Sequence, residues 1–103
     1  MTARLIGIPK PKTYRSAKLR EAVAALPCVS CGREGATQAA HANEGKGMAI
    51  KASDAMISAL CVQCHSELDQ GKTMTRAERR TFALEMVAKT YVALMEAGRL
   101  EVV

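Results

Sequence analysis

The first periodic pattern of apolar residues lies near the start of the chain. Leu19, Val23 and Leu26 stand at positions i, i+4 and i+7, and alanines fill much of the space between them. Apolar residues at this spacing fall on one face of an α-helix. Pro27 follows directly, and a proline cannot continue a helix. The pattern predicts a helix over residues 14–26.

A second and longer helical pattern occupies the end of the chain. Thr75 and Glu78 have the residue types and the spacing of a capping box, and Gly98 is suited to end a helix. The apolar stripe between them, which we expect to pack into the core, consists of Leu84, Val87, Tyr91, Leu94 and Met95. The pattern predicts a helix between Thr75 and Gly98.

The central part of the chain has the pattern of short strands and turns. Residues 36–41 and 57–60 are small or apolar and are bounded by turn-forming residues, which favours β-strands. Residues 43–47 form a glycine-rich loop by composition, and a turn is expected at Ser53 and Asp54.

A third helix should follow the second strand. We expect it to start at the second cysteine pair and to run to Gln70, with Gly71 as its C′ residue. Helices on either side of a short pair of strands place the chain in the α+β class.

The predicted core is thin for 103 residues. The hydrophobic fraction is 49%, but many of these residues are alanines, and the chain has one Phe, two Tyr and no Trp. Small domains of this kind commonly need a metal or disulfides. We expect a basic arm over residues 1–13 and a single domain over residues 14–103. No stretch approaches the ~20 apolar residues of a membrane-spanning helix, and the arm lacks the apolar run of a signal peptide. A membrane or secreted protein is therefore not expected.

The four cysteines form two Cys-x-x-Cys pairs separated by 29 residues: Cys28 with Cys31, and Cys61 with Cys64. A tight turn within each pair can direct both sulfurs toward one ion, and Gly32 suits such a turn. Disulfides are rare in the reducing compartment expected here. The spacing predicts a structural zinc ion held by four thiolates, with a redox-active pair as the alternative.

Both histidines of the chain lie close to these cysteine pairs. His65 directly follows Cys64, and Asp69 lies four residues further on, so both side chains share one face of the predicted helix and can share an ion. The alternatives for His65 are a solvent-facing residue or a zinc ligand in place of a cysteine. His41 lies where the first strand meets the glycine-rich loop. Three roles are open for it: a site residue, a neighbour of the zinc or a loop cap.

Positive charge is concentrated at the start of the chain. The net charge is +5, and residues 1–33 hold seven Lys or Arg but a single acid, Glu21. Such a segment is typical of proteins that approach a polyanion, although a solvated basic arm has the same composition.

Several of these features together resemble the HNH (ββα-metal) endonuclease superfamily, and within it small nuclease-like proteins of phages and prophages. The likeness covers roughly residues 14–80. It is carried by Cys28-x-x-Cys31, Ala40-His41-Ala42-Asn43, Asp54 and Leu60-Cys61-x-x-Cys64-His65. The resemblance implies a zinc-stabilised, treble-clef-like ββα-metal core with flanking N- and C-terminal helices.

The resemblance also implies roles for individual residues. His41 matches the general base, Asp54 stands near the middle asparagine position that steadies the hairpin loop, and His65 matches a ligand of the catalytic ion. Asp69 stands where some members have a second ligand. Many members carry a further ligand directly before the base, where this chain has Ala40. A turn or N-cap role is the alternative for Asp54.

The implied activity is hydrolysis of phosphodiester bonds in DNA with Mg²⁺ or Mn²⁺, in the cytoplasm of a bacterial host cell. A catalytically inactive, zinc-containing DNA-binding module is the alternative, favoured by Ala40. The oligomeric state stays open. Phosphate contacts are expected from Lys10, Lys12, Arg15, Arg33, Asn43, Lys46 and Lys51.

Overall fold

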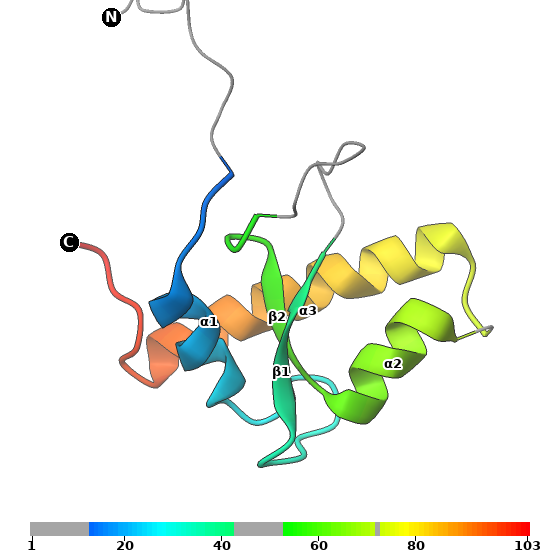
Figure 1. Cartoon of the computed structure of the whole chain (residues 1–103), viewed down its shortest axis with the longest axis horizontal. Helices are drawn as coiled ribbons and strands as arrows, with labels where there is room; N and C mark the ends of the chain where they lie inside the picture. The colour runs from blue at the N-terminus through cyan, green and yellow to red at the C-terminus, as the bar shows by residue number, and fades with distance from the viewer. Residues whose placement is uncertain (1–12, 43–52, 72) are drawn as a thin grey trace, which may run out of the picture.

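The structure of the protein, a computed structural model, describes residues 13–42, 53–71 and 73–103 (Figure 1). The described elements are, in chain order, α1 (Ala17–Ala24), β1 (Thr37–His41), β2 (Ile57–Cys61), α2 (Val62–Gln70) and α3 (Arg76–Glu96). The expected α+β class is confirmed. The predicted arm lies outside the described residues except for Thr13. No helix in the described ranges is long and apolar enough to cross a membrane.

The two strands form an antiparallel sheet in which Ala39 is opposite Ala59 and His41 is opposite Ile57. Every residue of β2 is buried. Ile57 and Ala59 pack with α1 and with Leu94 of α3, while Leu60 belongs to a second cluster with Ala40 and Met86. Figure 1 shows α3 running across the sheet, with α1 on one side of the two strands and α2 on the other. β2 is therefore fully enclosed, whereas β1 is only partly buried.

Thr90 anchors α3 to the sheet. Its hydroxyl accepts a hydrogen bond from the backbone N–H of Ala59 (2.9 Å) and donates one to the carbonyl of Met86 (2.7 Å). The carbonyl of Ala59 accepts from the N–H of Val29 at 2.9 Å. Both backbone groups of Ala59, which do not bond to β1, are thus satisfied, as buried polar groups must be.

The same anchor sets the buried face of α3. The buried residues of the helix are Met86, Val87, Thr90 and Leu94, so the predictions for Val87 and Leu94 are confirmed. Met95 is 54% exposed, and its predicted place in the core is wrong. The reason is that Thr90 is turned toward the sheet. The residues that share its face of the helix are those four positions before and after it, Met86 and Leu94.

The ends of α3 follow the sequence signals. The side chains and backbones of Thr75 and Glu78 form both bonds of the capping box. Gly98 has φ +71°. Its N–H donates to the carbonyl of Met95 at 3.1 Å, and the N–H of Arg99 donates to the carbonyl of Leu94. These bonds form a Schellman motif, which confirms Gly98 as the stop.

α1 is shorter than predicted at both ends, and α2 differs from prediction only in the conformation of the glycine that follows it. α1 starts at Ala17 because Ser16 is its N-cap, with the Ser16 hydroxyl accepting from the N–H of Leu19. Gly71 follows α2 with φ −65°, so the left-handed C′ conformation expected there is wrong. Glycine is needed at this position for space, since a Cβ would lie 2.2 Å from the carbonyl oxygen of Glu67.

Candidate functional site

The two cysteine pairs meet at one point. The four sulfur atoms all lie within 4.8 Å of one another, and those of Cys31 and Cys61 are 3.7 Å apart. In each pair the first sulfur accepts the backbone N–H of the second cysteine, at 3.5 Å in the first pair and 3.4 Å in the second. The predicted clustering is confirmed, and these thiols could hold a metal ion such as zinc.

The electrostatics of the four thiols fit a bound cation. Burial opposes ionisation of Cys28, but backbone N–H groups outweigh it and lower the pKa of this thiol to about 6. Burial, together with the neighbouring sulfur of Cys61, raises the pKa of Cys64 to about 12. Thiolates crowded this closely repel one another, so a positive ion is needed to hold all four in the ionised form.

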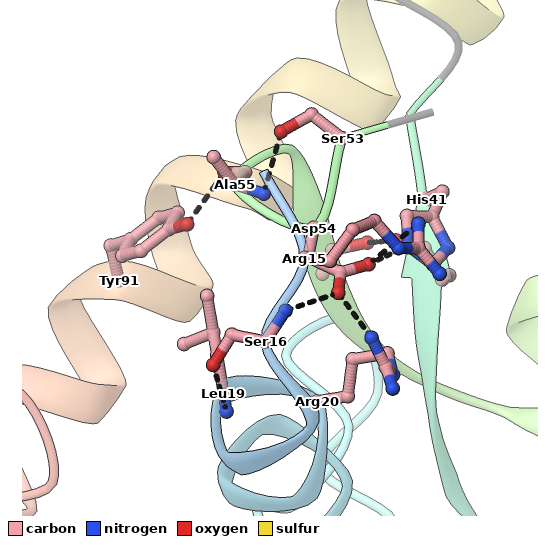
Figure 2. A network of polar contacts seen from close by, with 11 residues as sticks. Arg15, Ser16, Leu19, Arg20, His41, Ser53, Asp54, Ala55 and Tyr91 are labelled. Atoms are coloured by element: carbon pink, nitrogen blue, oxygen red, sulfur yellow. Dashed lines mark hydrogen bonds and ion pairs between the residues drawn. The ribbon is translucent and has the colours of Figure 1, made fainter. Parts of the chain in front are cut away.

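A second group of polar side chains is centred on Asp54, which is fully buried (Figure 2). Oδ1 of Asp54 lies 2.7 Å from Nε2 of His41 and 3.3 Å from the guanidinium of Arg15. Oδ2 accepts from the backbone N–H of Ser16 at 2.7 Å and from the guanidinium of Arg20. The group thus joins the turn before β2 to the start of α1 and to the end of β1.

This environment keeps Asp54 ionised. Burial alone would raise the pKa of the carboxyl group, but hydrogen bonds from His41, Ser16 and Arg20 and the charge of Arg15 outweigh burial and lower the pKa to about 2. An ionised carboxylate can only accept hydrogen bonds. Nε2 of His41 must therefore carry a hydrogen and donate a hydrogen bond to Asp54. In a neutral His41 this leaves Nδ1 as the nitrogen with a lone pair that can accept a proton.

His65 and Asp69 lie on one face of α2, as their spacing predicts. Nε2 of His65 is 3.2 Å from Oδ2 of Asp69, and Nδ1 of His65 is 2.8 Å from Oε1 of Gln38 on β1. Because Oε1 can only accept, Nδ1–H donates to it. Nε2 of a neutral His65 then presents a lone pair toward the carboxylate, an arrangement that requires a proton or a cation between the two atoms.

An open cleft of about 430 Å³ brings together residues of β1, α2 and α3. His41 and Asp69 line it, and so do three arginines from the first turns of α3: Arg76, Arg79 and Arg80. The spacing of these arginines, i, i+3 and i+4, places them on one face of the helix. The cleft thus combines the predicted base, one predicted ion ligand and a concentration of positive charge.

The remaining predicted contact residues lie elsewhere. Arg33 is exposed beside the first cysteine pair, where its carbonyl accepts the N–H of Cys28 at 2.9 Å. The side chain of Arg15 is 45% exposed but is directed toward Asp54. Five predicted contact residues fall outside the described residues: Lys10, Lys12, Asn43, Lys46 and Lys51.

The sequence patterns did not single out Gln38 or the three arginines of the cleft. Gln38 is recognisable only once β1 lies beside α2, because it is 27 residues from His65 in the chain. For the arginines a signal was present, since three cations share one face at the start of a helix, where the macrodipole does not favour positive charge.

Residues 2–97 match the family model described as "Protein of unknown function (DUF968)". The chain belongs to this family. Among solved structures, it is similar to the one described as "Structure of a putative bacteriophage protein from Escherichia coli str. K-12 substr. MG1655", with 25% identity and a TM-score of 0.51 over 82% of this chain and 96% of that one. No curated protein matches the sequence. This chain thus shares its fold with the protein described there as a putative bacteriophage protein.

Proposed function

We propose that this DUF968 protein is a metal-dependent DNA endonuclease of the HNH type. His41 is the general base, His65 and Asp69 hold a catalytic Mg²⁺ or Mn²⁺, and the four cysteines hold a structural Zn²⁺. The observation that carries the proposal is the cleft, whose lining includes a histidine held by a buried carboxylate, the carboxylate of Asp69 and three arginines.

The order of the elements supports this assignment. β1, β2 and α2 follow one another as a hairpin and a helix, with His41 at the end of the first strand and His65 in the helix. This is the arrangement that a ββα-metal core requires. The second cysteine pair spans the junction of β2 and α2, so a zinc ion there would fix the start of the helix that carries His65.

The pair formed by His65 and Asp69 has the geometry of two neighbouring ligands. Adjacent ligands of an octahedral Mg²⁺ with bonds of 2.0–2.1 Å are about 3 Å apart, and the observed separation is 3.2 Å. The hydrogen bond to Gln38 fixes the tautomer that leaves Nε2 free for a metal. With two protein ligands, the ion keeps several waters, as Mg²⁺ usually does.

In the proposed reaction, each of these groups has a separate role. Nδ1 of His41 takes a proton from a water molecule, and the oxygen of that water attacks the phosphorus. The bond to the leaving oxygen breaks, and this oxygen takes a proton from solvent water. The divalent ion, when bound, stabilises the negative charge that develops on the phosphate oxygens. Asp54 stabilises the protonated form of His41 that results.

The decisive experiment is plasmid nicking by the purified protein with and without Mg²⁺ or Mn²⁺. We expect nicking by the wild-type protein, and a rate lower by roughly 10²–10⁴-fold for His41→Ala, the usual contribution of a positioned base. Zinc content and DNA affinity should stay near those of the wild type. Equal nicking by His41→Ala would show that another group is the base.

Ala40 favours a second candidate, a zinc-containing DNA-binding module without catalysis. Ala40 lies on the same face of β1 as Gln38, two residues away, and Gln38 contacts His65. A carboxylate or imidazole at position 40 would therefore lie on the side of the proposed ion, where the alanine supplies no ligand. This candidate predicts DNA binding without cleavage by any divalent metal.

A further inference from the structure

The three arginines of α3 have no role in the proposed proton transfer, although they line the same cleft as His41 and Asp69. We propose that Arg76 and Arg79, with Arg80 beside them, form a clamp for a phosphate of the DNA strand next to the phosphate that is cut. The proposal rests on the proposed function and specifies how the substrate is held.

The side chains that line the cleft carry more positive than negative charge, which favours binding of an anion. Its lining contains three arginines and a single carboxylate, that of Asp69. Among the residues that the structure describes, no acidic side chain lies within ion-pair distance of Arg76 or Arg79. Guanidinium groups that share one cleft repel one another, so an anion bound between them would be stabilised. A bound divalent ion would add to the positive charge.

The chemistry of the side chains favours a phosphate diester. A guanidinium group presents its donors in a planar fork that matches two phosphate oxygens, whereas a smaller anion would use only part of it. Arg76 and Arg79 are one helical turn apart, with Cβ atoms about 5–6 Å from each other, so both can reach the same phosphate or two consecutive ones.

The position of the clamp defines its relation to the reaction. Asp69, on the α2 side of the cleft, is a proposed ligand of the ion that contacts the reacting phosphate, while the arginines come from α3. A strand that places one phosphate beside His41 and Asp69 would extend along the cleft and bring a neighbouring phosphate to the arginines. The clamp therefore requires a polynucleotide, and contacts to phosphates carry no preference for base sequence.

The test is the affinity for a short labelled DNA duplex, measured by fluorescence anisotropy over a range of salt concentrations without added divalent ion. The test protein is the double variant Arg76→Gln/Arg79→Gln, and the control is Arg99→Gln. Arg99 is exposed beyond the far end of α3, a helix about 30 Å long, and carries the same charge. We expect each lost arginine to weaken binding by about tenfold or more, as for a charged hydrogen bond. The slope of log affinity against log salt should fall by about 0.9 per arginine.

Equal affinity and slope for the double variant and Arg99→Gln would overturn the clamp, whether or not the wild-type protein nicks DNA. A clear loss of binding in a protein that never cleaves would retain the clamp and reject the nuclease. Circular dichroism and zinc content report whether the double variant is folded. If it is not, Arg76→Lys and Arg79→Lys serve instead: they should keep the salt slope and lose affinity, and unchanged affinity would also overturn the proposal.

Discussion

Nε2 of His41 donates a hydrogen bond of 2.7 Å to Oδ1 of Asp54, a carboxylate with no exposed surface. Thirteen residues separate the two in the chain. Asp54 in turn is bound by Arg20 and by the backbone of Ser16, so the orientation of the proposed base depends on the start of α1. Asp54 and Arg20 are thus positioning residues for His41.

The first prediction concerns the stability that Asp54 provides. Asp54→Asn keeps the shape of the side chain but removes the negative charge that binds two guanidinium groups. The variant also has one acceptor oxygen where the carboxylate has two. We expect the free energy of unfolding to fall by about 1–3 kcal/mol, the cost of losing bonds to a buried charged group. The cost should stay below that of breaking a fully buried ion pair, because Arg15 and Arg20 are partly exposed and can turn to solvent.

Denaturant titration measures this change. The matched control is Asp69→Asn, which removes a carboxylate that is 57% exposed and should alter stability by less than about 0.5 kcal/mol. Similar unfolding curves for the two variants would show that the contacts of Asp54 contribute no net stability.

The second prediction is a pH dependence. The pKa of Asp54 falls from its ordinary value of 3.8 to about 2 in the folded protein. The stability from this shift is fully present above pH 4 and is lost as the pH falls from about 4 toward 2, since the unfolded chain takes up the proton first. We expect the melting temperature of the wild-type protein to fall in this window more steeply than that of Asp54→Asn. Parallel curves would contradict the assignment of the shift to Asp54.

Features fixed by local spacing were predictable from the sequence. His65 and Asp69 meet because a helix places residues i and i+4 together, and the capping box of Thr75 and Glu78 depends on three consecutive peptide units. The cysteine cluster was predictable for a different reason: two Cys-x-x-Cys pairs at this spacing are typical of one metal site, so their convergence could be inferred without knowing the path between them.

Features that depend on long-range packing were not predictable. Arg20 contacts Asp54 across 34 residues, and no pattern in either segment indicates the partner. Met95 was wrongly assigned to the buried face of α3 because Thr90, a polar residue, is the one that bonds to the sheet, and a search for apolar periodicity does not select a polar residue. The orientation of α3 that turns Thr90 toward the sheet also determines that the three arginines line the cleft, so their position was not predictable either.

The third prediction tests the hydrogen bond behind the proposed ion site. Gln38→Leu removes the acceptor that fixes the tautomer of His65, without touching either proposed ligand. We expect the Mg²⁺ concentration for half-maximal nicking to rise by about 10- to 100-fold, the usual effect of losing a partner of a metal-bound histidine. The maximal rate at saturating Mg²⁺ should change less. Gln70→Leu, an exposed substitution at the end of α2, is the control. An unchanged Mg²⁺ requirement in Gln38→Leu would mean that His65 is not a ligand or does not depend on Gln38.

The last prediction concerns the metal held by the cysteines. We expect about one equivalent of zinc in the purified protein, because four thiolates within 4.8 Å match a tetrahedral structural site. Cys61 and Cys28 belong to the same core cluster as Leu60 and Met86, so loss of the ion should loosen the sheet as well as the cysteine pairs.

Strong chelation, or the substitution Cys61→Ser, should therefore abolish the cooperative thermal transition followed by circular dichroism, and added zinc should restore it in the chelated wild type. Gln63→Ala is the matched control, since Gln63 is exposed between Cys61 and Cys64 and contributes no sulfur. Its zinc content and melting temperature should equal those of the wild type. A metal-free protein that keeps the same melting temperature would show that the small apolar core is sufficient and that the cysteines serve another purpose, with the redox-active pair as the next hypothesis to test.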